Sequence, residues 1–139
     1  MRTKHLIIVG LIGMLLCSCV SNQRLALVAK QQVGSHYKKG QSAQCAAFVA
    51  HCVHKAGKEP PAWPNKARNW LKWGTPVPYL LKQPGDVIIT HRNGRNSGDG
   101  HIMIYVGNGK AVHRSTLSKP VETINVDHYR DRVLGVRRG

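Results

Sequence analysis

The sequence has few acidic residues: Asp and Glu together number 6, whereas Lys and Arg number 21. The basic residues occur singly and in pairs, with no block of five or more, and aromatic residues make up only 6% of the chain. A nucleic-acid interface usually needs a basic stripe interleaved with aromatic side chains. The absence of such a stripe argues against a nucleic acid as the partner. Diffuse positive charge instead suits a protein that works at an anionic surface such as a cell wall.

The sequence has one long apolar run, residues 6–16, and this run is too short to cross a bilayer comfortably. It follows a short basic N-terminus containing Arg2 and Lys4, which is the layout of a secretory signal peptide. We therefore expect a signal peptide over residues 1–18. Residues 16–19 read LCSC, which resembles the lipobox of bacterial lipoproteins and predicts lipid attachment at Cys19. An ordinary signal cleavage near the same place is the alternative.

Export and lipidation would place the protein in the cell envelope. The residue after Cys19 is Val20 rather than Asp, which, by analogy with Gram-negative sorting rules, favours the outer membrane facing the periplasm. Residues 19–24 are then a tether, and residues 25–139 form the folded domain. Loss of Arg2 and Lys4 leaves 19 basic residues against 6 acidic ones, a net charge of +13.

Cysteine is also scarce, with four in the chain, of which Cys45 and Cys52 fall in the expected domain. Both lie on one expected helix, seven residues apart. Seven helical residues rise about 10 Å, which is too far for a disulfide. We therefore expect a free thiol in an exported protein, and that thiol needs an explanation.

The chain contains no internal repeat and is of a length for one domain. Apolar spacing and breaker residues predict helices first and strands afterwards. This order predicts an α+β domain with an antiparallel sheet. The expected helices cover residues 22–33, 43–56 and 65–72, and the expected strands cover residues 86–90, 101–106, 110–113 and 133–138.

The expected hairpin between residues 101 and 113 has a register that can be derived. A two-residue turn would place His113 on the core face, opposite Ile104. A three-residue loop over residues 107–109 instead pairs Val112 with Ile104. His113 then shares a face with His101 as a diagonal neighbour, within side-chain reach. The second register buries valine rather than histidine, so we expect both imidazoles to point into one site.

Cys45 sits near the start of its expected helix, upstream of these two histidines. A helix N-terminus and a nearby imidazolium favour the thiolate form of a cysteine, which is the nucleophilic form. A thiol combined with two imidazoles therefore predicts a cysteine hydrolase.

Several segments, in the same order, resemble the motifs of the NlpC-type peptidoglycan peptidases, a papain-like family related to the CHAP amidases. The nucleophile motif, usually DCSGFV, is matched by QCAAFV. The resemblance extends over nearly the whole chain from about residue 25. The matching segments are QCAAFV (44–49), PGDV (84–87), GHIMIYVGNG (100–109), VHRS (112–115), HYR (128–130) and VRR (136–138).

This resemblance implies a papain-like fold and cleavage of an amide in the peptidoglycan stem peptide, typically the bond from D-Glu to the diamino acid. It implies that Cys45 is the nucleophile, His101 the general base and acid, and His113 the residue that orients the imidazole. Tyr37 matches a tyrosine whose hydroxyl lines the site and assists the oxyanion. No cofactor and no metal are expected, and the partners are the stem peptide and, through the lipid anchor, a membrane. We expect a monomer.

The nucleophile motif departs from the family pattern, since Gln44 replaces Asp and residues 46–47 are Ala-Ala rather than Ser-Gly. The CHAP amidases carry Gln at this position, so the change leaves activity possible but puts the substrate preference in doubt. Two other hypotheses remain open. The chain could be a peptidoglycan-binding lipoprotein without activity, or a papain-like lipid or acyl transferase.

The remaining cysteine, histidine and tryptophan side chains have simpler interpretations. Cys52 is expected in the core, as a lone cysteine on an apolar helix usually is. His51 and His54 lie on the same helix but have no ligand cluster for zinc. The three tryptophans, Trp63, Trp70 and Trp73, either pack the helix against the sheet or line a glycan groove, and packing is the default.

Overall fold

The computed structural model describes residues 20–37, 44–92, 100–116 and 118–139. The expected signal peptide (1–18) and the expected lipid-attachment residue Cys19 therefore lie outside the described residues. Within these ranges, no helix combines the length and the hydrophobicity that a membrane span requires.

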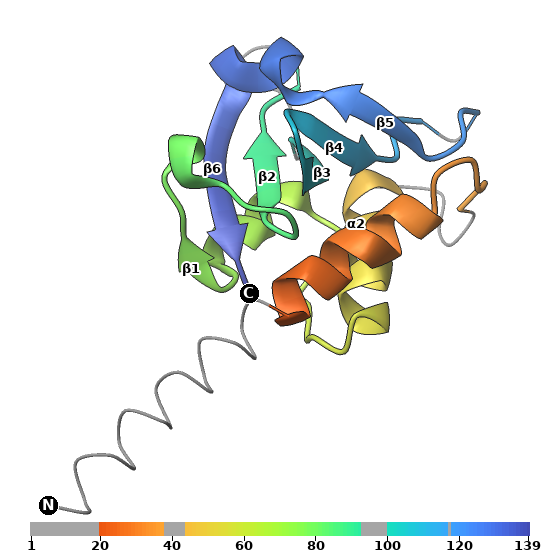
Figure 1. The fold of residues 1–139 in the computed structure, drawn as a ribbon, viewed down its shortest axis with the longest axis horizontal. Helices are drawn as coiled ribbons and strands as arrows, with labels where there is room; N and C mark the ends of the chain where they lie inside the picture. The colour runs from red at the N-terminus through yellow and green to blue at the C-terminus, as the bar shows by residue number, and fades with distance from the viewer. Residues whose placement is uncertain (1–19, 38–43, 93–99, 117) are drawn as a thin grey trace, which may run out of the picture.

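Six strands of the described residues form one sheet in the order β1-β6-β2-β3-β4-β5, and every neighbouring pair is antiparallel (Figure 1). Helices precede most of the strands along the chain, so the expected α+β class is confirmed. The strands are β1 (Thr75–Pro76), β2 (Val87–Thr90), β3 (His101–Gly107), β4 (Lys110–His113), β5 (Glu122–Asn125) and β6 (Val133–Arg138).

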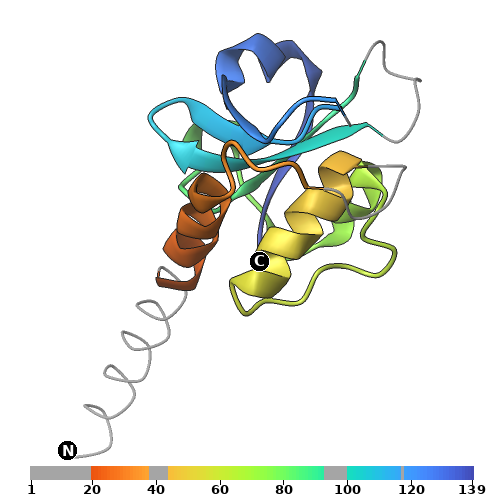
Figure 2. The same cartoon turned by 90° about the vertical axis from the view of Figure 1, so that its right-hand side faces the viewer.

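In the part of the chain that the structure describes, the α-helices lie on one face of the sheet (Figure 2). The chain is helical over residues 20–31, and α2 spans Gln44–Lys55. Gly57 ends α2 with a φ of 83°, a conformation that glycine adopts readily. The described ranges also contain the 3-10 helices η1 (Ala67–Lys72), η2 (Tyr79–Leu81) and η3 (Val126–Arg132).

The sheet separates two buried clusters because successive strand residues point to opposite faces. Ile89 and Ile102 pack with Phe48 of α2 in the larger cluster, between the helices and the sheet. Ile88 and Met103 pack on the other face, with residues of η3. The strands of this sheet are therefore buried on both sides at its centre.

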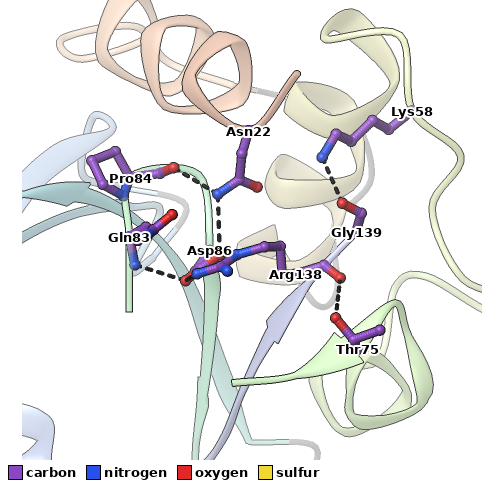
Figure 3. Close-up of polar contacts among 8 residues, drawn as sticks. All are labelled: Asn22, Lys58, Thr75, Gln83, Pro84, Asp86, Arg138 and Gly139. Carbon is purple, nitrogen blue, oxygen red and sulfur yellow. Dashed lines mark hydrogen bonds and ion pairs between the residues drawn. The ribbon is translucent and has the colours of Figure 1, made fainter. Parts of the chain in front are cut away.

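The first helix is tied to the sheet by Asn22, which is only 4% exposed. Its side-chain amide donates to the Pro84 carbonyl at 2.7 Å and to the Asp86 carboxylate at 3.1 Å (Figure 3). The expected boundary between tether and domain, after residue 24, falls inside this helix.

Asp86, the acidic residue of the PGDV segment, is completely buried at the start of β2. The Arg138 guanidinium at the end of β6 donates to both of its carboxylate oxygens, each at 2.8 Å (Figure 3). The backbone N–H of Gln83 donates to Oδ2 at 2.7 Å. Asp86 therefore joins the first helix, its own turn and the last strand.

The β3–β4 hairpin has the register that the apolar pattern predicts, because Ile104 pairs with Val112. The loop residues Gly107, Asn108 and Gly109 all have positive φ, of 95°, 53° and 70°. Glycine and asparagine tolerate this conformation. Gly107 pairs with Lys110, so the turn has two residues, Asn108 and Gly109, rather than the three expected, and a bulge between Tyr105 and Gly107 produces the expected register.

Candidate active site

His101 begins β3 and His113 ends β4, so the hairpin register brings the two rings together. His101 Nε2 lies 2.6 Å from His113 Nδ1, and the ring planes are nearly perpendicular at 80°. Both side chains are buried, with exposed fractions of 5% and 1%. The expectation that both imidazoles occupy one site is confirmed.

Glu122 extends this pair into a chain of three side chains. Its carboxylate lies 2.9 Å from His113 Nε2, and it is the direct cross-strand partner of His113 on β5. Glu122 was not among the expected site residues, because no strand was expected where β5 lies. Residues 122–125 are half-exposed and carry no apolar run that would mark a strand.

The hydrogen bonds assign the tautomers of both rings. An ionised carboxylate only accepts, so His113 donates from Nε2 to Glu122. A neutral His113 then has a bare Nδ1, which accepts from His101 Nε2–H. The proton of a neutral His101 is thereby placed on Nε2, and its Nδ1 carries a free lone pair.

His101 Nδ1 is buried and has no hydrogen-bond partner among the described residues. Burial, His113 and Arg92 lower the pKa of His101 from 6.5 to about 3, so the ring is neutral near pH 7. A neutral imidazole with an unoccupied ring nitrogen can act as a base.

The pKa of His113 is also lowered, because burial outweighs the hydrogen bond and charge of Glu122, which act in the opposite direction. Two neutral rings in contact avoid the repulsion that two imidazolium ions would suffer. The site is therefore a neutral hydrogen-bonded chain that ends in a carboxylate.

A cavity of about 210 Å³ opens beside the two histidines. The Tyr129 ring stacks on His101 with a centroid distance of 6.0 Å. Arg92 and Arg132 bring positive charge to this cavity, and Arg132 donates to the Arg92 carbonyl at 3.2 Å. The lining residues are His91, Arg92, His101, His113, Ser115, Thr116, Tyr129 and Arg132.

Cys45 is the second residue of α2 and is 3% exposed. It belongs to the buried cluster on the helix side of the sheet, where α2 packs against β3. Among the described residues, no hydrogen bond joins its thiol to His101 or His113. The nucleophilic role of Cys45 therefore stays a prediction, as do the catalytic roles of the two histidines.

Tyr37 packs against the middle of α2 rather than against His101 and His113. Its ring lies 5.9 Å from Phe48 and 5.2 Å from His51, measured between centroids. Burial and the neighbouring Cys52 raise the pKa of its hydroxyl. Its predicted role at the oxyanion also stays a prediction.

Cys52 is completely buried, and burial raises the pKa of its thiol to about 12. It is a core residue, as expected. Both Cys45 and Cys52 are free cysteines. In the described part of the chain, no three His, Cys, Asp or Glu side chains gather to hold a metal ion.

Comparison with known proteins gives concordant results. The model of the NlpC/P60 family matches residues 34–138. A "Probable endopeptidase" of Mycobacterium bovis is 33% identical over 103 residues, covering 71% of this chain and 25% of the relative. A "Probable endopeptidase" of Corynebacterium glutamicum is 26% identical over 112 residues, covering 78% of this chain and 50% of the relative. The chain thus spans a quarter to a half of the length of these relatives.

Solved structures show the same fold. NlpC2 from Trichomonas vaginalis superposes with a TM-score of 0.73 at 22% identity, covering 85% of this chain and 46% of that one. An NlpC/P60 family protein from Bacillus cereus superposes with a TM-score of 0.69 at 23% identity, covering 84% and 39%. The papain-like architecture expected from the motifs is therefore confirmed. With a family match over most of its length, the chain belongs to the NlpC/P60 family.

Proposed function

We propose that this domain is a cell-wall hydrolase, a cysteine peptidase that cleaves an amide bond in peptidoglycan stem peptides. The bond from D-Glu to the diamino acid is the proposed target. The family membership and the relatives described as probable endopeptidases support this assignment. The observation that carries it is the chain from Glu122 through His113 to His101, which leaves a base at His101 Nδ1.

The proposed reaction begins with proton transfer from the Cys45 thiol to His101 Nδ1. The thiolate then attacks the amide carbonyl carbon, and the carbonyl oxygen becomes an oxyanion. The backbone N–H of Cys45, in the first turn of α2, stabilises that oxyanion, with help from Tyr37. Collapse of the intermediate breaks the C–N bond, and His101 gives its proton to the leaving amine.

The second half of the reaction uses the same groups in reverse. His101 removes a proton from water, the resulting hydroxide attacks the thioester, and the carboxylic acid leaves as the thiol is restored. Throughout both halves, His101 Nε2–H stays bound to His113. Glu122 is a positioning residue in this scheme, because it keeps the His113 Nδ1 lone pair directed at His101.

The neutral state of His101 determines how the nucleophile is activated. The sequence favoured a thiolate of Cys45 formed in advance and stabilised by an imidazolium. With the pKa of His101 lowered to about 3, general-base transfer from thiol to imidazole is the better description. The rate should then follow the basicity of Nδ1, which His113 and Glu122 control.

Charge at the cavity fits the proposed substrate. Arg92 and Arg132 line the space beside the histidines, and stem peptides carry free carboxylates. Arginine binds carboxylates with two parallel hydrogen bonds, which would orient the peptide for attack. We further propose that the protein acts in the cell envelope, held there by lipid on Cys19.

The test is a digest of purified peptidoglycan followed by mass analysis of the muropeptides. Wild-type protein should produce stem peptides cut at one amide, and Cys45→Ala should lower the rate by about a thousandfold or more. Cys52→Ala is the matched control and should keep its activity, since its thiol lies in the core. Undiminished cleavage by Cys45→Ala would refute the mechanism.

Alkylation separates the alternatives. Iodoacetamide should label Cys45 much faster than Cys52, because only Cys45 is activated in this scheme. Intact stem peptides together with slow labelling would identify a binding protein without activity. Intact stem peptides with rapid labelling and an acyl group transferred from lipid would identify a transferase.

A further inference from the structure

The three tryptophans divide into two buried residues and one exposed residue. Trp70 and Trp73 are 0% and 7% exposed, whereas Trp63 is 81% exposed. The default expectation of packing therefore holds for the first two only. A large aromatic side chain left in solvent has no part in the core.

The backbone of Trp63 is in a costly conformation. Its φ is 54°, in the left-handed region that bulky residues rarely adopt. Pro64 follows and restricts the preceding residue further. Such conformations persist only where the surrounding structure enforces them, and they concentrate at ligand-binding positions.

Three side chains from the following 3-10 helix and its end hold this loop in place. Asn69 Nδ2 donates to the Trp63 carbonyl at 2.9 Å. The indole N–H groups of Trp70 and Trp73 donate to the Pro64 and Glu59 carbonyls at 2.9 Å and 2.8 Å. The two buried tryptophans thus hold the loop in the conformation that presents the exposed one.

Trp63 borders a groove of about 310 Å³. Trp73 and Pro61 contribute apolar surface to it, and Asn69 and Lys72 contribute polar groups. The Asn69 amide oxygen accepts no hydrogen bond from the described residues. The groove therefore combines aromatic surface with an amide group and a cationic side chain.

This groove lies far from the histidines. Gly74 in its lining precedes β1, whose Thr75 pairs with Arg138 at the end of β6. The opposite end of β6, Val133, pairs with Thr90 beside His101. The five residue steps along β6 correspond to roughly 17 Å. Figure 1 shows β1 at one end of β6 and η3 at the other.

We propose that this groove binds a saccharide unit of the cell-wall glycan strand. A pyranose ring presents a face of C–H groups that packs on an indole, and its edge carries hydroxyl and acetamido groups for Asn69 and Lys72. The volume of about 310 Å³ lies at the lower end of the range for small-molecule sites and suits one such unit. This inference rests on the proposed wall substrate, in which glycan and stem peptide are covalently joined, so that one polymer can reach both sites.

The experiment measures binding of a soluble tetramer of N-acetylglucosamine by tryptophan fluorescence, and of purified peptidoglycan sacculi by co-sedimentation. Trp63→Gly removes the indole while relieving the backbone, so it should fold at least as well as Trp63→Ala. Both variants should bind the tetramer at least tenfold more weakly than wild type. Trp63→Tyr should stay within a few-fold, because it keeps an aromatic face.

Leu80→Ala is the matched control. Leu80 is 79% exposed on η2 and lies outside the groove, so its removal should leave binding unchanged. Wild-type binding of the tetramer by Trp63→Gly would overturn the proposal. The proposal would also be overturned if the wild-type protein did not bind the tetramer but bound anionic phospholipid vesicles or a proline-rich peptide in a manner that depends on Trp63.

A glycan-free stem peptide separates this proposal from the proposed function. Trp63→Gly should cleave that peptide at the wild-type rate, while Cys45→Ala should bind the tetramer normally and cleave nothing. Loss of peptide cleavage in Trp63→Gly would contradict an independent glycan groove. Absence of cleavage by the wild type, with tetramer binding that depends on Trp63, would refute the proposed function and leave the groove intact.

Discussion

Two buried polar clusters lie at opposite ends of β2, and they differ in how fully their hydrogen-bonding groups have partners. At its start, the two carboxylate oxygens of Asp86 receive four hydrogen bonds, two from Arg138 and one each from Asn22 and Gln83. At its far end, Thr90 pairs with His101, which bonds to His113 through Nε2 and has no described partner at Nδ1. His113 in turn bonds to Glu122.

The difference separates a structural cluster from a chemical one. A buried charge with every acceptor position filled by fixed donors has no capacity left for a substrate. A buried base with one open position does. One buried polar cluster of this sheet therefore joins the helix of residues 20–31 to β6. The other leaves a lone pair on His101 Nδ1 available to accept a proton.

Removing the open base should have the largest effect on activity. We expect His101→Ala to lower kcat/KM for stem-peptide cleavage by about a thousandfold or more, because no other group occupies its position. The stability of the His101→Ala variant near pH 7 should change far less than its activity. A muropeptide digest and a denaturant titration measure the two quantities. An active His101→Ala would remove the histidine chain from the mechanism.

Removing the saturated carboxylate should instead affect folding. Asp86→Ala leaves the Arg138 guanidinium without its buried partner, and we expect a loss of about 3–5 kcal/mol in the free energy of unfolding. Asp131→Ala, an exposed acidic residue, is the control and should stay within about 0.5 kcal/mol. Cleavage per folded molecule should be unchanged. A specific loss of activity in folded Asp86→Ala would break the distinction between the clusters.

Glu122 should have an intermediate effect. Glu122→Ala removes the acceptor that holds His113 Nε2–H, so the rings can exchange tautomers and a proton can occupy His101 Nδ1. We expect kcat to fall about 10- to 100-fold, as for other residues that orient a catalytic or ligating histidine. KM should change little, and Glu59→Gln, on an exposed acidic residue, should have no effect.

A further test concerns the dependence of stability on pH. The pKa of His101 is about 3 in the folded protein and near 6.5 when unfolded, so the unfolded chain binds more protons between these values. Stability should therefore fall as the pH drops from about 6.5 towards 3, by at most about 1.4 kcal/mol per pH unit for this group. Denaturant titrations at several pH values should show a shallower dependence in His101→Gln. An unchanged dependence would contradict the assigned pKa.

Local patterns predicted much of the fold. The last strand was expected over residues 133–138 and lies there, because alternation and the preceding turn are short-range features. The hairpin register followed from burying Val112 instead of His113. The pairing of His101 with His113 was a consequence of that register.

Other features depended on contacts between segments far apart in the chain. β5 has no apolar run, and only its pairing with β4 places Glu122 against His113. Trp63 and Trp70 are the same residue type seven positions apart, yet one is in solvent and the other in the core. The sequence by itself thus determines the turns, the apolar periodicity of helices and strands, and the motifs that identify the family. Packing decides which lone pair stays open and which indole stays exposed, because burial depends on neighbours that the local sequence does not specify.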